Sequence, residues 1–405
     1  MSKSITFFFP HNPYPARSGG HQRCLEMLSA FRDLGCSVSL LSSTLWTDQA
    51  WSDEAIRALE ARYVRSVRIW KPTATDLELR ALDKERRPNP PLADKVWAPP
   101  ALVEWVAKEI AALCPDALVM SYPFWDVLYS KEARADRRTI IDIHEIASMQ
   151  VPLEALLWEQ IGSLPLSLTS MQPSLIDELQ FAAQPLTVDG EEMSLYNQYD
   201  CTIAISLRER EVISAHCPDT TGLYIPATYT PAERPLSCSG RPLFPVGPNP
   251  LNLQAYAFFV VKVLPHILGV DDRFELCVSG HWSKTHLFDA SGITLLGFVP
   301  DLDTLYENTS YLVTPVLGGT GQQVKIVEAM ARGLPVVAWH SVQGNSPIVH
   351  GENGLIAHSP EEFAEHIVRL ETDPAFRRRL GHTAWETVKD SFSRRHFLEE
   401  LQKAL

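Results

Sequence analysis

Short apolar runs alternate with amphipathic helical segments along most of the chain, and this alternation limits the fold more than any other feature. Residues 5–9 form the first apolar run, a loop rich in proline and glycine follows over 10–20, and a helical pattern then continues to about Gly35. Residues 37–42 form the next apolar run. Strand, glycine turn, helix and strand in this order build the βαβ unit of a doubly wound sheet. The sequence therefore predicts an α/β fold with parallel strands.

The alternation occurs twice, and a segment rich in proline and serine separates the two series. Residues 228–241 have this composition, which is typical of an interdomain linker. A chain of 405 residues also exceeds the size at which one hydrophobic core keeps growing. We therefore predict Rossmann-like domains over residues 1–227 and 242–385, and a C-terminal helix over 386–405 that packs back on the first domain. Both sheets are expected to face an interdomain cleft with their carboxyl ends.

Charge and cysteine usage exclude several classes of protein. The formal net charge of −13 argues against binding to nucleic acid, which needs clustered Lys and Arg to displace counterions. The seven cysteines are scattered without a CxxC pair, which predicts neither a disulfide framework nor a zinc site. The first apolar run is too short for a signal sequence, and no apolar segment is expected to approach the roughly 20 residues that span a bilayer. We expect a cytoplasmic protein, with peripheral contact to the inner membrane face as the remaining form of membrane association.

One segment does not follow the alternation. Residues 146–189 are rich in apolar groups but lack the period of a strand. They fit either a helical pair that fills core space or a lid that binds an acceptor or faces a membrane. The sequence leaves both interpretations open.

A glycine cluster stands where a doubly wound sheet binds its ligand. Gly318-Gly319-Thr320-Gly321-Gln322 follows the apolar run 311–314 and precedes a helical pattern over 323–332. Glycines let the backbone approach an anion closely, and a helix N-terminus offers unpaired N–H groups and a positive dipole end. A diphosphate fits such a loop, whereas a plain tight turn is the alternative. Lys325 and Glu328 lie on the helix behind the cluster.

The segment GGTGQQVKIVEAMARGLPVV, which begins at Gly318, resembles the donor-site signature of family four retaining glycosyltransferases of GT-B fold, the glycosyl transferases group 1. Residues 15–23 resemble the first glycine loop of that family, and 295–306 and 351–357 resemble two further stretches of it. The resemblance implies a nucleotide-sugar donor as substrate, with no other cofactor. It also implies a glycan, lipid-linked or small-molecule acceptor, and transfer with retention.

The same resemblance implies roles for single residues. Glu328 would accept hydrogen bonds from the donor ribose hydroxyls, a role that suits an acceptor-only carboxylate. The glycines of two loops would line the diphosphate: Gly19, Gly20, Gly318, Gly319 and Gly321, together with Thr320 and Gln322.

Two departures from the family pattern concern the donor. Thr320 stands where the family has a first Glu, so the contacts of that carboxylate to sugar hydroxyls are missing or are replaced by a hydroxyl. Residues 246–252 contain no basic residue, although the family often has Arg and Lys there. Lys325 is the best candidate for the missing positive charge. The alternative for Lys325 is a surface ion pair with Glu328 at the i, i+3 spacing.

His144 and Glu145 end the apolar run 139–143, at the predicted edge of the cleft. The resemblance implies that His144 lies near the transferred sugar and bonds a sugar hydroxyl or the leaving phosphate, with Glu145 orienting it or the acceptor. A structural strand-end histidine is the alternative. With no Asp-x-Asp motif noted in a strand-end loop, no metal is expected. A sugar-nucleotide epimerase of the same architecture and a non-catalytic nucleotide-sugar-binding subunit remain the other candidate functions.

Overall fold

The computed structural model describes residues 2–45, 49–86, 98–161, 188–247 and 249–405, which divide into two compact units. Unit 1 contains the chain up to Ser148, Val188–Thr228 and Arg394–Leu405. Unit 2 contains Tyr229–Ser393 and, among the described residues before Val188, those from Met149 to Ile161.

Unit 1 is built on a parallel sheet of seven strands in the order β3-β2-β1-β4-β5-β6-β7. The strands are β1 (Ser4–Phe8), β2 (Ser37–Ser43), β3 (Ser66–Trp70), β4 (Ala117–Ser121), β5 (Arg138–Asp142), β6 (Cys201–Ala204) and β7 (Thr221–Tyr224). Its longer helices are α1 (Gly19–Asp33), α2 (Asp53–Arg62), α3 (Ala74–Arg86), α4 (Pro100–Leu113), α8 (Gly190–Tyr196), α9 (Leu207–His216) and α16 (Arg394–Ala404). The central strands are continuous apolar runs because helices cover both faces of a parallel sheet.

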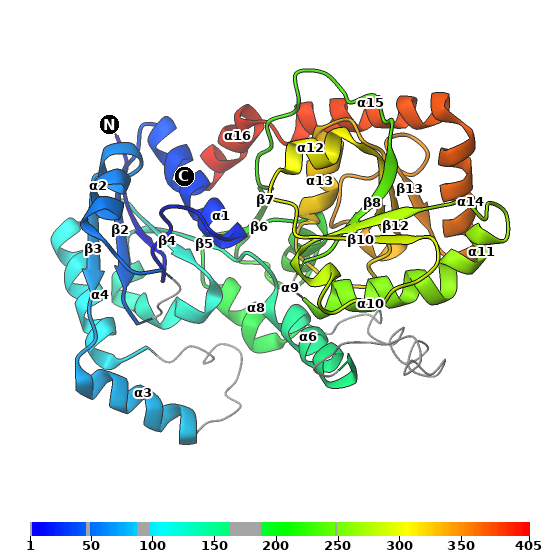
Figure 1. The fold of residues 1–405 in the computed structure, drawn as a ribbon. Helices are drawn as coiled ribbons and strands as arrows, with labels where there is room; N and C mark the ends of the chain where they lie inside the picture. Colours follow the sequence, from blue (N-terminus) through cyan, green and yellow to red (C-terminus); the bar gives the residue numbers. More distant parts are fainter. Residues whose placement is uncertain (1, 46–48, 87–97, 162–187, 248) are drawn as a thin grey trace. The chain divides into compact units, whose positions relative to one another are not determined.

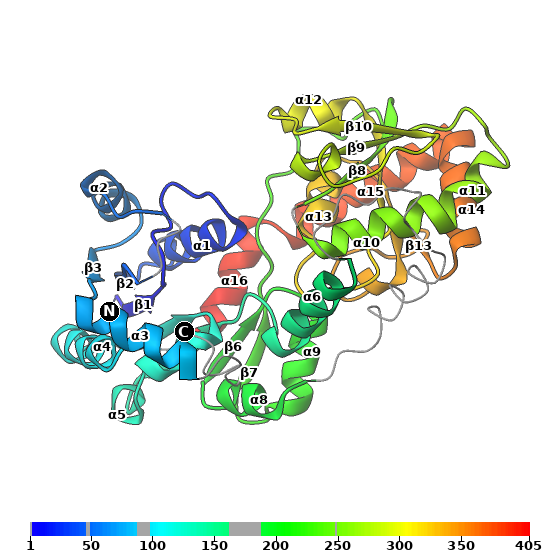
Figure 2. The same ribbon diagram turned by 60° about the horizontal axis from the view of Figure 1, so that its bottom comes forward.

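The last helix of the chain belongs to unit 1. In Figure 1 and Figure 2, α16 lies beside α1, and its Phe397, Leu401 and Ala404 are buried in the same hydrophobic core as Phe31 of α1. Arg394 at the start of α16 also bonds the Asp33 carboxylate of α1 at 2.7 Å.

Unit 2 is built on a second parallel sheet, of six strands in the order β10-β9-β8-β11-β12-β13. The strands are β8 (Arg241–Pro245), β9 (Leu276–Ser279), β10 (Ile293–Gly297), β11 (Thr309–Thr314), β12 (Val336–Trp339) and β13 (Leu355–Ala357). Its helices include α6 (Ala147–Ile161, from Met149 onward), α10 (Pro250–Phe258), α11 (Leu264–Leu268), α12 (Leu302–Glu307), α13 (Val324–Ala331), α14 (Pro360–Thr372) and α15 (Pro374–Ser391). The predicted α/β class with two parallel sheets is therefore confirmed.

The helix α6 begins in the segment whose role the sequence left open. Leu153 and Leu157 of α6 are buried in the main core of unit 2, which also contains Leu251 and Phe258 of α10. Figure 1 and Figure 2 show α6 beside α10. The described part of the 146–189 segment thus fills core space, and residues 162–187 lie outside the described residues.

The expectation that no apolar segment approaches the roughly 20 residues that span a bilayer is wrong. The helical run Pro250–Leu268 is 19 residues long and apolar enough to cross a membrane by length and composition. In unit 2, however, 72% of its most apolar window is buried inside the protein, as in a core helix. The run is longer than expected because α10 continues through a π-helical turn, Phe259–Val263, into α11.

Candidate functional site

In unit 1, the predicted residue His144 follows a buried ion pair at the carboxyl end of β5. Asp142, the last residue of β5, accepts two hydrogen bonds of 3.0 Å from the guanidinium of Arg23 on α1. The two side chains are almost inaccessible to solvent. Burial is the largest single influence and raises the pKa of Asp142, but the charge and hydrogen bonds of Arg23, with a contribution from His144, together lower it. The pair therefore stays ionised and ties α1 to β5 by bidentate, charge-assisted bonds.

The His144 ring is fixed on three sides. Its Nε2 lies 2.8 Å from the Ser121 hydroxyl and 3.5 Å from an Asp142 carboxylate oxygen. Its face stacks on the ring of Tyr122, with centroids 4.0 Å apart and an interplanar angle of 17°. Burial lowers the pKa of His144 to about 4, despite the opposing charge of Asp142. His144 is therefore neutral near pH 7 and can donate or accept a hydrogen bond, but it supplies no positive charge.

Gly20 reaches this cluster and Gly19 does not. A Cβ added at Gly20 would overlap the Tyr122 hydroxyl, whereas one added at Gly19 would meet no atom within 4 Å. Tyr122 and His144 both have left-handed backbone, with φ of 70° and 60°. Glu145 is half-buried, and its backbone N–H donates to the Ile143 carbonyl at 2.6 Å. The structure thus places Gly20 at the hydroxyl end of Tyr122 and His144 on a face of its ring.

In unit 2, the glycine cluster forms the loop between β11 and α13. Gly319 has a φ of 117°, which side-chain-bearing residues rarely adopt, and its carbonyl accepts a 2.7 Å bond from the Asn345 amide. The Thr320 hydroxyl is buried and lies 3.5 Å from the side-chain oxygen of Gln150 on α6. Gly318, Gly321 and Gln322 are half-buried. The helix α13 that follows has no side-chain hydrogen bond capping its N-terminus.

The Lys325 side chain reaches residues 245–252, a segment that contains no basic residue. Its ammonium donates to the Pro245 carbonyl at 2.7 Å and to the Asn252 side-chain oxygen at 3.1 Å, at the carboxyl end of β8. An ammonium has three N–H donors, so one remains for an anion. Burial lowers the pKa of Lys325 to about 8, which leaves the group mostly charged at pH 7. The positive charge at the carboxyl end of β8 therefore comes from a residue of α13.

Glu328 lies on α13 one turn after Lys325, but it has a different partner. The Tyr306 hydroxyl of α12 donates to a Glu328 carboxylate oxygen at 3.3 Å. Glu328 is half-buried. Because the Lys325 ammonium is directed to Pro245 and Asn252, the two side chains act separately rather than as a simple surface pair.

Sequence reasoning missed several residues of these clusters, namely Arg23, Ser121, Tyr122, Asp142, Gln150, Asn252, Tyr306 and Asn345. Asp142 carries a usable signal, because it lies near the end of the apolar run 139–143, and Ser121 and Tyr122 stand at the end of the apolar strand β4. Arg23 and Asn345 carry none, since each acts through a contact with a segment more than 20 residues away.

One Asp-x-Asp sequence does follow a strand, contrary to the sequence interpretation. Asp301, after β10, caps α12 by accepting bonds from the N–H groups of Asp303 and Thr304. Asp303 pairs with Arg332 at 2.9 Å. Both carboxylates thus have structural partners. Within the described ranges, no group of three or more His, Cys, Asp or Glu residues is arranged to hold a metal ion.

Residues 244–373, which include β8, the glycine loop, Lys325 and Glu328, match the family described as "Glycosyl transferases group 1". This segment is a glycosyl transferases group 1 domain. Two curated relatives match parts of the chain. An uncharacterized 44.6 kDa protein in the cps region of Klebsiella pneumoniae is 21% identical over 165 residues, 38% of this chain and 42% of that protein. "Glycosyltransferase 1 domain-containing protein 1" of Xenopus tropicalis is 31% identical over 121 residues, 27% of this chain and 34% of that protein. The matches thus span less than half the length of either relative.

Solved structures match the whole chain. A mutant of TarM from S. aureus, in complex with fondaparinux, alpha-GlcNAc-glycerol and UDP, has 11% identity, covers 99% of both chains and gives a TM-score of 0.62. At this identity the likeness concerns the fold. The chain therefore has the predicted GT-B fold, with the glycosyl transferases group 1 domain in its second parallel-sheet unit.

Proposed function

We propose that the chain is a glycosyltransferase that moves a sugar from a nucleoside-diphosphate sugar to a glycan, lipid-linked or small-molecule acceptor, with retention and without a metal. The position of Lys325 is the observation that carries the proposal. Its ammonium lies at the carboxyl end of β8, on the helix that follows the glycine loop. The match of residues 244–373 to glycosyl transferases group 1 supports the same function.

The donor-side geometry favours a diphosphate. The N-terminus of α13 has no side-chain cap, and its positive dipole end follows the glycine loop, although the N–H groups of Val324 and Ile326 already donate to the carbonyls of Gln322 and Gln323. The backbone of Gly318 to Gly321 lets phosphate oxygens approach closely. Lys325 adds a charge that a metal would otherwise supply. Glu328 would then accept hydrogen bonds from the ribose hydroxyls.

The unit 1 cluster supports a role beside the transferred sugar. A neutral His144 can exchange hydrogen bonds with a sugar hydroxyl. Its ring is already oriented by Ser121 and Tyr122, so little side-chain freedom is lost on binding. We assign the deprotonation of the acceptor to the leaving phosphate, as the family resemblance implies.

Isothermal titration with UDP, GDP and ADP and with the matching nucleosides tests the proposal. Losing a charge-assisted hydrogen bond costs roughly 1.5–3 kcal/mol, so Glu328→Ala should weaken both nucleotide and nucleoside about ten- to a hundredfold. Lys325→Ala should weaken the diphosphate and leave the nucleoside nearly unchanged, with a smaller effect at high salt.

Lys389→Ala is the matched control, because this exposed lysine lies on α15, away from the glycine loop in the sequence. If both site variants fold and bind nucleoside diphosphates as tightly as the control, α13 is not a donor site. A protein that binds the nucleotide sugar but never transfers or hydrolyses it would instead be a binding subunit.

A further inference from the structure

Two buried carboxyl groups hold the backbone immediately after His144. The N–H groups of Ile146, Ala147 and Ser148 are consecutive, and each donates to a glutamate side chain from another helix. Glu192 comes from α8 and Glu209 from α9. Glu192 and Glu209 are only 2% and 1% exposed, so water does not compete for these hydrogen bonds.

Glu209 takes the first of the three N–H groups. One carboxyl oxygen accepts from the Ile146 N–H at 3.1 Å, and the other lies 3.0 Å from the Ser206 hydroxyl. The Ser206 hydroxyl in turn accepts the Glu209 N–H and caps α9. Burial raises the pKa of Glu209 to about 8. At pH 7 the side chain is therefore mostly the neutral acid, which a glutamine can imitate.

Glu192 takes the other two N–H groups. Its oxygens accept from Ala147 at 2.9 Å and from Ser148 at 2.8 Å, and the Tyr196 hydroxyl donates to it as well. In the opposite direction, the Ser148 hydroxyl accepts a hydrogen bond from the N–H of Asp189, the N-cap residue of α8. The starts of α6 and α8 thus cap each other.

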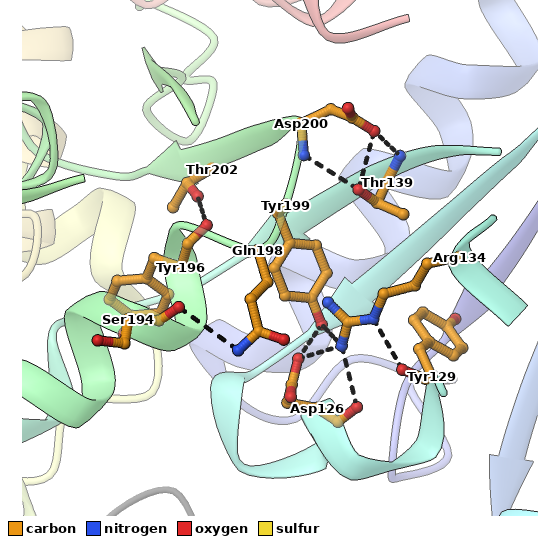
Figure 3. Close-up of polar contacts among 10 residues, drawn as sticks. All are labelled: Asp126, Tyr129, Arg134, Thr139, Ser194, Tyr196, Gln198, Tyr199, Asp200 and Thr202. Carbon is orange, nitrogen blue, oxygen red and sulfur yellow. Dashed lines mark hydrogen bonds and ion pairs between the residues drawn. The ribbon is translucent and has the colours of Figure 1, made fainter. Parts of the chain in front are cut away.

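Contacts beyond the C-terminal end of α8 fix this helix in place. Figure 3 shows that the Tyr199 hydroxyl bonds Asp126 at 2.7 Å, where the Arg134 guanidinium also binds, and that Asp200 accepts from the N–H and hydroxyl of Thr139 at the start of β5. Glu192 is therefore presented by a helix that is held, through Asp200, to β5, the strand that His144 follows.

This arrangement exceeds what a helix start requires. A single local serine caps α1, for example, where Ser18 accepts the His21 N–H. Two carboxyl groups are withdrawn from water here, and both come from segments at least 44 residues away. They also occupy the N–H groups that would make the start of α6 an anion site. The arrangement fixes the path of the chain at 144–148 more tightly than a local cap would.

We infer that Glu192 and Glu209 are positioning residues that hold the left-handed turn at His144, so that its ring stays between Ser121 and Tyr122. The inference rests on the proposed function for its effect on turnover, but not for its effect on the ring. A turn that relaxes toward right-handed backbone would carry the ring off the Tyr122 face, because φ of 60° is a sparsely populated conformation for histidine.

The two glutamates should respond differently to glutamine. In Glu209→Gln the amide oxygen still accepts the Ile146 N–H, and its NH₂ group can donate to Ser206. In Glu192→Gln one of the two backbone N–H groups meets an NH₂ donor instead of an acceptor. Glu192→Gln and Glu209→Ala are therefore the disruptive variants, and Glu209→Gln is the conservative rescue of Glu209→Ala. Glu191→Gln and Glu211→Gln are matched controls, because these neighbours are exposed.

The first readout is the imidazole NMR spectrum of His144 in the full-length protein, assigned with His144→Ala. At pH 7 and well below the melting temperature, Glu192→Gln and Glu209→Ala should shift the His144 resonances and lose the Tyr122 ring-current effect. Glu209→Gln and both controls should retain the wild-type spectrum. An unchanged spectrum in the two disruptive variants would overturn the inference, even where their stability is reduced.

The second readout is transfer or hydrolysis of UDP-glucose, GDP-mannose or ADP-glucose, whichever the wild type turns over. The disruptive variants should lose at least tenfold in kcat, while the Kd for the bare nucleoside diphosphate stays within twofold. Glu209→Gln should recover most of the loss. A wild type without turnover would contradict the proposed function alone, because the NMR result stands independently. Equal loss of kcat in the controls would contradict the inference.

Discussion

At the scale of single residues, burial sets the charge of the groups on which the proposed reaction depends. His144 and Lys325 both lose solvent, and both have a lowered pKa, but the outcomes differ. With a pKa of about 4, His144 is neutral at pH 7, whereas Lys325, with a pKa of about 8, still carries most of its charge. Their surroundings thus give two basic side chains different charges at pH 7.

The pKa of Lys325 predicts how donor binding changes with pH. Affinity for a nucleoside diphosphate should be full at pH 7 and should fall up to about tenfold by pH 9, because the ammonium deprotonates on passing pH 8. Titration calorimetry between pH 7 and 9 measures this, since the phosphate charge is constant there. The Lys325→Ala protein should bind weakly with no such slope. A steep slope that survives in this variant would assign the titration to another group.

Glu209 predicts a pH dependence of stability. Its folded-state pKa of about 8 lies above the ordinary value of 4.5, so the folded state binds the proton more tightly than the unfolded state. The contribution of Glu209 to stability is fully present below about pH 4.5 and is lost as pH rises through about 8. The loss lowers the free energy of unfolding by roughly 2–5 kcal/mol. The charge of Glu145 adds to this cost.

Urea denaturation at pH 5 and pH 9 measures that contribution. Glu209→Gln should match the wild type at pH 5 and exceed its stability at pH 9. Equal stability of the two proteins at both values would show that Glu209 ionises without cost in the folded state.

At the scale of elements, the start of α1 distinguishes two adjacent glycines. Gly20→Ala should push the Tyr122 ring from its stack on His144 and cost about 1–3 kcal/mol, as overpacking does. Gly19→Ala meets open space and should cost less than 0.5 kcal/mol. Urea denaturation of the two variants makes the comparison. Equal costs would mean that Tyr122 moves aside freely.

The sequence predicted elements well where their pattern is internal to one segment. The strands β1, β2, β5 and β11 match apolar runs bounded by loops, and all four were expected. The edge strands β3, β7 and β13 were not, because each has only three to five residues and β3 and β7 are largely half-buried or exposed. Their pairing depends on a neighbouring strand rather than on their own period.

Residues of the candidate site were likewise predictable only where the pattern lies within one segment. His144, Lys325 and Glu328 could be named from local pattern and resemblance. The contacts of Lys325 with Pro245, and of Glu192 with Ala147, could not, because they join residues 80 and 45 positions apart. Such contacts depend on how strands order themselves in a sheet, which no local period encodes.

At the scale of the whole molecule, α16 completes the core of unit 1. Phe397 and Leu401 are at most 1% exposed there, and burying each such side chain is worth about 1.5–3 kcal/mol. A chain ended after Ser393 should therefore lose several kcal/mol of unit 1 stability while unit 2 still binds nucleoside diphosphate. Scanning calorimetry with UDP titration separates the two effects. Loss of UDP binding together with retained unit 1 stability would reverse the expectation.

This placement of α16 also sets an order on biosynthesis. The ribosome makes the strands of unit 1 first, yet the helix that closes their core emerges only after every residue of unit 2 has been translated. Unit 2 can finish folding first, although domains usually mature in the order of translation. The nascent unit 1 meanwhile exposes the apolar surface that Phe397 and Leu401 will cover, so this surface can aggregate until translation ends.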